Sequence, residues 1–340
     1  MEKPVPPTQA TGPHAAQGAA AAADARQLQQ AQDAQDAQAR KAAQPGEDRP
    51  APGPGHPEPA TPLPRQHLKK PGIEADMELA PRFKAPHYRG SGKLAGFGAI
   101  VTGGDSGIGR AVAVLFAREG ADVAVLYLNE HEDAEETRRC IEAEGQRCLL
   151  IPGDVKSSAF CRSAVDQVVA AFGRLDVLVN NAAFQLHAEQ LEDLTEERFD
   201  ETFRTNIYGY FHMAQAALPH LRRGSSIINT GSVTGLQGSA HLLDYSATKG
   251  AIHAFSMSLA KNLAPRGIRV NAVAPGPVWT PLNPADKPAE EIADFGKDTD
   301  LGRPAQPEEI APAYVFLASP HCSSYITGEI LPIIGGYSGG

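Results

Sequence analysis

Short apolar runs alternate with helical patterns along residues 93–340, and this alternation limits the fold more than any other feature of the chain. The helical patterns are clearest at 132–144, 157–172 and 307–317, where several open on Ser, Asp or Pro and close on Gly. The apolar runs suit buried parallel strands and cover 99–101, 123–128, 148–151, 177–179, 226–229, 268–273 and 330–334. The pattern predicts the α/β class, with a single doubly wound Rossmann-type domain whose parallel sheet binds ligands at the carboxyl ends of its strands.

A glycine-rich turn follows the first of these apolar runs. Residues 102–109 read T-G-G-D-S-G-I-G and lead into the amphipathic stretch 110–120. Gly107 and Gly109 allow the backbone to approach a pyrophosphate, whose charge the first-turn amides and the positive helix end would bind. The spacing differs from the common G-x-G-x-x-G pattern. On its own the turn is equally a tight strand-to-helix connection.

Tyr245 and Lys249 stand four residues apart in an uninterrupted helical stretch, so they share one face of the helix. A free tyrosine titrates near pH ~10, and lowering its pKa by about three units requires roughly 4 kcal/mol of differential stabilisation. A neighbouring lysine supplies part of that. An isolated pair of this kind also arises by chance on many helices, so the pair gains its meaning from the motifs around it.

Taken in order, these motifs resemble the short-chain dehydrogenase/reductase family over residues 92–340. Thr102, Gly103, Gly107 and Gly109 match its T-G-x-x-x-G-x-G pattern. Further matches follow in family order at Asp154-Val155, Asn180-Asn181-Ala182, Asn206, Ser232, Tyr245 with Lys249, and Pro275-Gly276-Pro277-Val278-Trp279-Thr280. Segments 103–107 and 127–137 resemble a bacterial subgroup with long N-terminal extensions, some of whose members are described as aldehyde reductases or stress-associated oxidoreductases.

The resemblance implies a role for each matching residue. Tyr245 is the general acid/base, Lys249 lowers its pKa and binds the nicotinamide ribose, Ser232 orients the substrate oxygen, and Asn206 holds a water in a proton relay. Ser232 is alternatively the cap of a turn, and Asn206 a partner of backbone groups in its own helix. The residues expected to contact the cofactor are Thr102, Gly103, Ser106, Gly107, Ile108, Gly109, Tyr127, Leu128, Asn129, Asp154, Val155, Asn180, Ala182, Tyr245, Lys249, Pro275, Gly276, Val278 and Thr280.

Cofactor choice depends on the end of the second strand. An acidic residue there would bind the adenosine ribose and favour NAD. Counting from Gly120, the position is Tyr127, followed by Leu128 and Asn129, so no acid opposes a 2′-phosphate. Ser106, however, stands where many phosphate-binding relatives carry Arg or Lys, and Glu130, Glu132 and Asp133 follow closely. NADP is therefore favoured, with NAD or dual use left open.

The expected substrate pocket is bounded by 184–187, 233–243 and a lid at 279–302, whose mixed apolar and amide side chains suit a small aldehyde, ketone or sugar-like alcohol. His187 and His241 are expected at its rim, and no metal is expected. Ala183 replaces the usual glycine of N-N-A-G, and Phe97-Gly98 replaces a common polar residue. A non-catalytic dinucleotide sensor or scaffold on the same fold is the alternative function. Among enzymes, an epimerase or dehydratase comes second.

Composition separates the N-terminal part of the chain from this domain. Residues 1–62 are rich in Ala, Gln, Pro and Gly, show no sustained apolar stripe and are predicted to be disordered. Residues 63–92 place apolar anchors among prolines and predict an extended arm that packs on the catalytic domain, 93–340, or on a neighbouring subunit. The anchors are Leu63, Leu68, Ile73, Met77, Leu79, Phe83 and Tyr88.

Net charge and cysteine content limit which binding partners and which cellular compartment we expect for the protein. A net charge of −9 disfavours electrostatic binding of nucleic acid. Four scattered cysteines without C-x-x-C spacing indicate reduced thiols in the cytoplasm, and neither a secretory signal nor a membrane span is expected. By family resemblance the chain is expected to form a homotetramer, with the small residues Ala247, Gly250, Ala251 and Ala254 allowing close helix contact.

Overall fold

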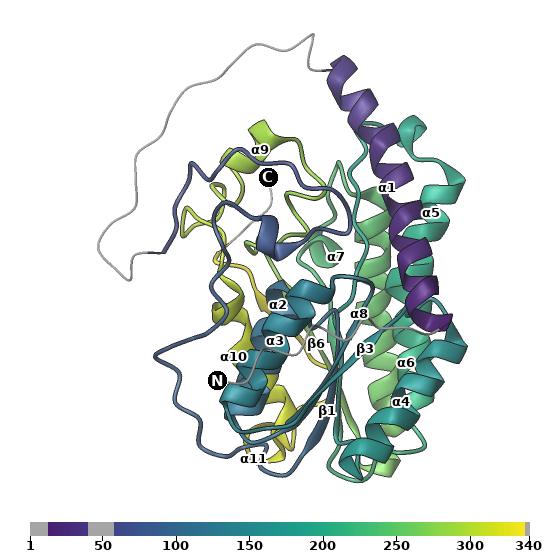
Figure 1. The fold of residues 1–340 in the computed structure, drawn as a ribbon, viewed down its shortest axis with the longest axis vertical. Helices are drawn as coiled ribbons and strands as arrows, with labels where there is room; N and C mark the ends of the chain where they lie inside the picture. Colours follow the sequence, from purple (N-terminus) through teal and green to yellow (C-terminus); the bar gives the residue numbers. More distant parts are fainter. Residues whose placement is uncertain (1–12, 40–57, 337–340) are drawn as a thin grey trace, which may run out of the picture.

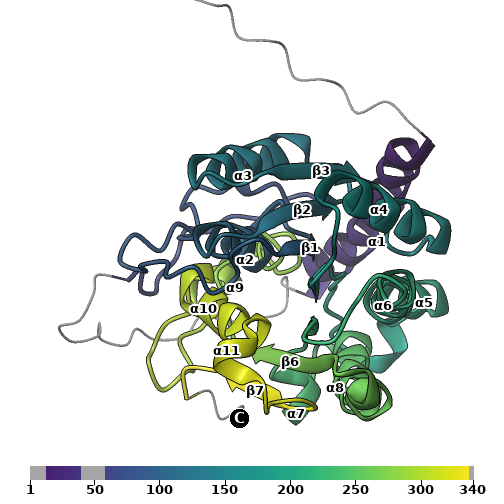
Figure 2. The ribbon, with the colours of Figure 1, turned by 90° about the horizontal axis from the view of Figure 1, so that it is seen from below.

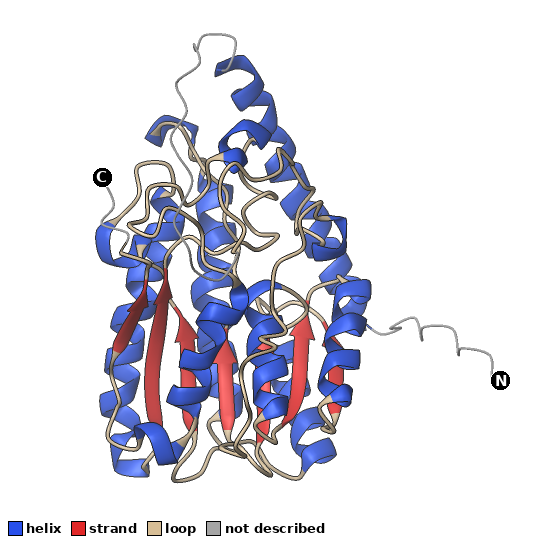
Figure 3. Cartoon of the chain, turned by 90° about the vertical axis from the view of Figure 1, so that its left-hand side faces the viewer, coloured by secondary structure: helices blue, strands red, loops and turns tan. Residues whose placement is uncertain are grey.

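A seven-stranded parallel sheet forms the centre of the molecule, in a computed structural model that describes residues 13–39 and 58–336. The strand order is β3-β2-β1-β4-β5-β6-β7, and all strands end at the same edge (Figure 3). The strands are β1 (Gly98–Thr102), β2 (Asp122–Tyr127), β3 (Cys148–Pro152), β4 (Val177–Asn180), β5 (Ser226–Thr230), β6 (Arg269–Pro275) and β7 (Ile330–Ile333). The predicted Rossmann-type sheet is confirmed.

Helices cover both faces of the sheet (Figure 2). The helices are α1 (Pro13–Ala39), α2 (Gly107–Arg118), α3 (His131–Ala143), α4 (Ser158–Phe172), α5 (Glu196–Phe203), α6 (Gly209–Ala217), α7 (Thr234–Gln237), α8 (Leu243–Leu263), α9 (Ala289–Ala293), α10 (Pro307–Ala318) and α11 (Pro320–Ser323). Short 3-10 turns lie at η2 (Glu74–Asp76), η3 (Leu191–Asp193) and η5 (Ala264–Arg266), and a π-helical turn at η4 (Arg204–Tyr208).

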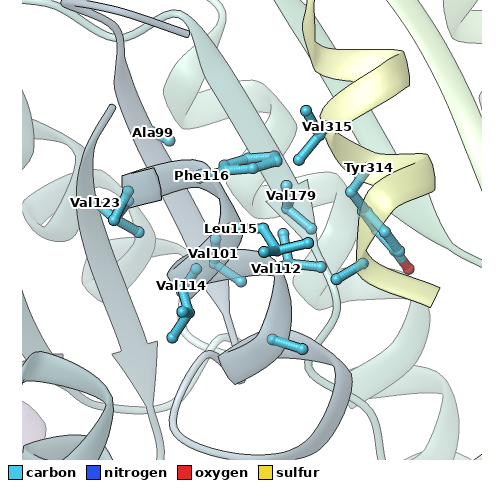
Figure 4. Packing of buried hydrophobic residues seen from close by; sticks show 14 of the residues in the cluster. Ala99, Val101, Val112, Val114, Leu115, Phe116, Val123, Val179, Tyr314 and Val315 are labelled. Carbon is cyan, nitrogen blue, oxygen red and sulfur yellow. The ribbon is translucent and has the colours of Figure 1, made fainter. Parts of the chain in front are cut away.

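The core has two halves because neighbouring strand residues point to opposite faces. On β1, Ala99 and Val101 pack with α2, α3 and α10, whereas Ile100 packs with α4, α6 and α8. Figure 4 shows the first half, in which Phe116 of α2 lies close to Val315 of α10. Burial on both faces explains why these strands are continuous apolar runs in the sequence.

Helix α1 is a correction to the predicted tail, since residues 13–39 form a 27-residue helix rather than a disordered chain. Alanine and glutamine favour the helix intrinsically. Polar groups help to dock it: Gln29 donates to the carbonyl oxygens of Leu68 and Ala285 (2.8 and 3.0 Å), and Arg198 of α5 donates to Gln32 (2.8 Å). Ala25 also packs against Phe184 and Leu186. Figure 1 shows α1 running beside α5. The remainder of the predicted tail, except 58–62, lies outside the described residues.

The arm follows a path across the catalytic domain. Leu63, Leu68 and Met77 are buried in one cluster with Trp279 of the lid, and the Trp279 indole donates to the carbonyl oxygen of Leu79 (2.9 Å). Phe83 is also buried, and Leu79 and Tyr88 are partly buried. Ile73 is the exception, because its side chain faces solvent. The arm therefore packs on its own chain's catalytic domain.

Among residues 13–39 and 58–336, no helix combines the length and the apolar character that crossing a membrane requires.

Candidate active site

One cleft of about 810 Å³ lies at the carboxyl edge of the sheet. Most of the residues predicted to bind cofactor or substrate line it: Gly103, Ser106, Gly107, Ile108, Tyr127, Leu128, Asp154, Val155, Ala182, Ser232, Tyr245, Lys249, Pro275, Gly276, Val278 and Thr280. The segments predicted to bound the substrate pocket contribute Phe184, Gln185, Val233 and Leu242. The fold thus brings motifs separated by up to 177 positions, from Gly103 to Thr280, around a single space.

Five predicted residues are not among those that line this cleft: Thr102, Gly109, Asn129, Asn180 and Asn206. The Thr102 hydroxyl accepts from the backbone amides of Asn181 and Ala182 (2.8 and 3.1 Å), which joins the ends of β1 and β4. The Asn180 amide donates to Asn229 of β5 (2.9 Å). These side chains hold the strand ends in place instead of facing the cleft.

The glycine-rich turn is packed so closely that two of its residues have to be glycine. A Cβ at Gly109 would lie 1.9 Å from the carbonyl oxygen of Gly103. Gly107 has a φ of +49°, and a Cβ there would lie 2.9 Å from the Thr280 methyl group. Helix α2 begins at Gly107, so its first amides face the cleft where a dinucleotide pyrophosphate fits. The turn therefore suits the predicted cofactor.

Tyr245 and Lys249 share one face of α8, as their spacing predicts. The Lys249 ammonium lies 5.2 Å from the centre of the Tyr245 ring and donates to the carbonyl oxygen of Thr230 (2.8 Å). Ser232 follows β5, and its hydroxyl accepts from the backbone amide of Thr234 (3.1 Å). The turn-capping alternative for Ser232 is thus present, while its side chain also reaches Tyr245.

The charge states of this pair differ from the sequence-based expectation. Burial raises the pKa of Tyr245 above its ordinary value, against the lowering effect of its hydrogen bond with Ser232. Burial also lowers the pKa of Lys249 to about 7. The predicted lowering of the tyrosine pKa by Lys249 is therefore not found in the free site. Removing water disfavours the charged form of both groups.

Asn206 lies in the π-helical turn η4, a kind of irregularity often found at functional sites. Its amide group donates to the carbonyl oxygen of Phe184 (2.9 Å) and to the Thr248 hydroxyl (3.0 Å), and its oxygen accepts from the Phe184 amide (2.8 Å). The structural alternative holds only in part, because the side chain satisfies backbone groups of Phe184 and not those of its own helix. Asn206 fixes the loop after β4 against α8, next to Lys249.

The adenosine end of the cleft carries two buried acids, Asp105 and Glu130. Burial and neighbouring carboxylates raise the pKa of Asp105 to about 6 and that of Glu130 to about 8. The Glu130 carboxyl group accepts a hydrogen bond from the backbone amide of Asn129 (2.8 Å). Sequence reasoning placed Glu130 after the cofactor segment and did not consider Asp105, since neither occupies the position at which an acid usually selects NAD.

His187 is buried rather than at the rim, which corrects the prediction. Its Nδ1 lies 2.9 Å from Asp286, and its Nε2 lies 3.0 Å from Asp36 of α1. Burial alone would lower the pKa of His187, but its hydrogen bonds to Asp286 and Asp36 outweigh that effect and raise the pKa to about 9. In the described part of the chain, Asp36, His187 and Glu189 place their potential ligand atoms close enough together, within 4.8 Å, to hold a metal ion. With both ring nitrogens engaged by carboxylates, His187 is an ion-pair bridge between α1 and the lid.

The N-terminal segments supply further walls of the cleft that sequence reasoning missed. Ala21 and Ala25 of α1 line it, as do Lys70, Pro71 and Gly72 of the arm. The Lys70 ammonium donates to the carbonyl oxygen of Gln185 (2.6 Å), and burial lowers its pKa to about 8. No local sequence pattern reports such contacts, because each joins positions more than a hundred residues apart.

Comparison with known proteins agrees with this geometry. Residues 103–338 match a family model described as enoyl-(acyl carrier protein) reductase. The chain is 56% identical over 273 residues to the uncharacterized oxidoreductase YhdF of Bacillus subtilis, a match covering 80% of this chain and 94% of YhdF. It is 50% identical over 278 residues to the chloroplastic NADPH-dependent aldehyde reductase 1 of Arabidopsis thaliana, covering 80% of this chain and 96% of that protein.

A solved structure is also similar. A short-chain dehydrogenase from Burkholderia cenocepacia, crystallised in complex with NADP, superposes with a TM-score of 0.68 at 37% identity and covers 73% of this chain and 100% of its own. The fold, the cleft and these relatives together assign the chain to the short-chain dehydrogenase/reductase family of NAD(P)-dependent oxidoreductases.

Proposed function

We propose that the protein transfers a hydride between NADP(H) and a small carbonyl or alcohol substrate, such as an aldehyde, a ketone or a sugar-like alcohol. The supporting observation is that Tyr245, Lys249 and Ser232 meet in the same cleft as the glycine-rich turn. The nicotinamide cofactor supplies the hydride, and the protein supplies binding, orientation and proton transfer.

In this proposal Tyr245 gives its proton to the substrate oxygen during reduction. A buried phenol with a raised pKa stays protonated at neutral pH, which suits an acid better than a base. Ser232 holds the same oxygen by a hydrogen bond. Lys249 uses one of its three N–H donors on Thr230, so the others are available for a cofactor ribose hydroxyl. A positive charge brought near Tyr245 in this way favours its release of the proton.

The preference for NADP is supported by the Arabidopsis aldehyde reductase and by the Burkholderia structure. Tyr127 stands at the end of β2, so no acid occupies the usual NAD-selecting position. Glu130 has a pKa of about 8 and is largely neutral at pH 7, which reduces its repulsion of a 2′-phosphate. NAD is the alternative cofactor, because Asp105 and Glu130 can accept ribose hydroxyls.

The direct test mixes the protein with NADPH or NADH and a panel of aldehydes, ketones and sugar alcohols, and follows absorbance of the reduced cofactor. Substrate-dependent consumption is the expected result. A dinucleotide sensor, the alternative on the same fold, would bind the cofactor without consuming it. A sensor is less consistent with the site because Ser232, Tyr245 and Lys249 are all present and adjacent.

We also propose a homotetramer in the cytoplasm. Large apolar side chains are exposed on neighbouring helices, including Phe199 of α5, Phe211 of α6 and Met257 of α8, which are 42%, 45% and 42% exposed. Burying such a surface against another copy of the chain is favourable. The four cysteines are unpaired thiols, as in a reducing compartment.

A further inference from the structure

The cap of helix α2 comes from the arm, not from the glycine-rich turn itself. Ser106 occupies the N-cap position but makes no capping hydrogen bond through its side chain. The carboxylate of Glu74 instead accepts the backbone amide of Gly107, with an N–O distance of 2.7 Å. Glu74 is 33 positions earlier in the chain and only 4% exposed. An element remote in sequence therefore satisfies the first amide of the helix that faces the cofactor.

Arg110 and Asp133 hold Glu74 in that position. The Arg110 guanidinium pairs with the second oxygen of Glu74 and donates through Nε to the carbonyl oxygen of Asp105 (2.7 Å). Asp133 of α3 accepts the backbone amides of Glu74 and Ala75 (2.6 and 3.1 Å). Both oxygens of Glu74 are thus engaged. Burial raises the pKa of Glu74 to about 7, and the contact with Arg110 opposes that rise. The main contribution of Glu74 to the turn is then to orient the Gly107 peptide group through its hydrogen bond.

The other side of the turn is closed by the segment after β6. The Thr280 methyl group leaves no room for a side chain at Gly107. The arm also meets this segment at Gly72, where a Cβ would lie 2.8 Å from the carbonyl oxygen of Pro281. The glycine-rich turn is held between the arm and the lid, and the Glu74–Gly107 hydrogen bond is the polar contact that joins the arm to it.

We propose that Glu74 is a positioning residue for the cofactor: by fixing the Gly107 peptide, it directs the next amides of α2 at the dinucleotide pyrophosphate. This inference rests on the proposed function and assigns the arm a part in cofactor binding rather than in catalysis. Loss of Glu74 should weaken the binding of NADPH and NADH alike, because the pyrophosphate is common to both. Turnover at saturating cofactor should stay close to that of the parent.

The test compares Glu74→Ala and Glu74→Gln with the matched control Glu78→Gln, whose side chain lies on the same arm but is exposed. Dissociation constants for NADPH and NADH are measured by energy transfer from Trp279, the only tryptophan of the chain. We expect Glu74→Ala to bind each cofactor about tenfold more weakly, the factor given by ~1.4 kcal/mol and within the range for loss of a helix cap. Glu74→Gln keeps an acceptor oxygen for the Gly107 amide and should bind both cofactors more tightly than Glu74→Ala. The control should match the parent.

Steady-state kinetics of the same proteins separate positioning from general damage. In Glu74→Ala the KM for cofactor should rise about tenfold, while kcat and the KM for the carbonyl substrate stay within twofold, with circular dichroism verifying the fold. Unchanged or tighter cofactor binding in Glu74→Ala, or an equal loss of kcat, would overturn the inference while leaving the proposed function intact. A parent protein that binds neither dinucleotide would overturn both.

Discussion

At the scale of single residues, the reaction depends on which groups carry a proton. Tyr245 is buried and protonated, and Lys249 has a pKa lowered to about 7 by burial. Neither state was evident from the sequence, which reported the spacing of the pair but not the removal of water around it. The consequence is a site suited to donating a proton during carbonyl reduction.

Replacing Tyr245 with Phe should therefore remove the acid and leave the shape of the cleft. We expect kcat to fall by roughly 10²–10⁴, the usual contribution of a general acid, with little change in the dissociation constant for NADPH. The control is Tyr325→Phe, because that ring is fully exposed. Rates of Tyr245→Phe within threefold of the parent would exclude this role.

A second residue-scale prediction concerns Glu130. Its raised pKa, about 8, means that it loses its proton as pH rises from 7 to 9 and then repels a 2′-phosphate. The dissociation constant for NADPH, relative to that for NADH, should increase across this range by about tenfold, the effect of one pKa unit of coupling. Titrating both cofactors at each pH measures it. Glu130→Gln should flatten the profile, and a ratio independent of pH in the parent would contradict the idea.

At the scale of elements, helix α1 and the arm are the parts that sequence patterns described least well. The strands and the helices α3, α4 and α10 lie within a residue or two of their predicted ranges, because burial on the sheet leaves a local apolar pattern. Helix α1 has no such pattern, since Gln29 and Gln32 dock it through hydrogen bonds to distant residues. The role of Glu74 is hidden for the same reason: its partner Gly107 lies far along the chain.

The stability that the docking of α1 adds to the protein should depend on pH, because His187 pairs with Asp36 of this helix. The pKa of His187 is raised from its ordinary value of 6.5 to about 9, so its stabilising contribution is fully present below pH 6.5 and is lost as pH rises through 9. We expect the difference in Tm between the parent and His187→Gln to be largest near pH 6 and to vanish near pH 10. His321→Gln, at an exposed histidine of α11, is the control. A Tm difference of constant size would show that His187 acts by packing alone.

At the scale of the whole molecule, the motifs of the site were predictable because each follows a strand whose end lies at the same edge of the sheet. Gly103, Ser232 and Lys249 could be assigned to one cleft on that ground. The residues that close the cleft could not be predicted. Ala21, Ala25 and Lys70 come from segments that contain neither a strand nor a recognisable motif. The described molecule is a predictable Rossmann-type core enclosed by an N-terminal cover.

Assembly is the remaining prediction at this scale. Light scattering at micromolar concentration should give a particle of about four chains, each of 35.9 kDa. Phe211→Asp should reduce that mass, because it replaces an exposed apolar side chain with a charge. Tyr325→Asp, at a fully exposed ring elsewhere, serves for comparison. A parent particle of 35.9 kDa would rule out association through this surface.

The length of the alanine tract 19–23 sets how the contacts before and after it are oriented around the axis of α1. Gly18, just before it, lies so close to Leu128 that a Cβ would come within 2.3 Å of that carbonyl oxygen, while Gln29, Gln32 and Asp36 make their contacts after it. One inserted or deleted alanine turns everything beyond it by about 100° on the helix. In this stretch the number of alanines therefore matters more for docking of the helix than the identity of each residue.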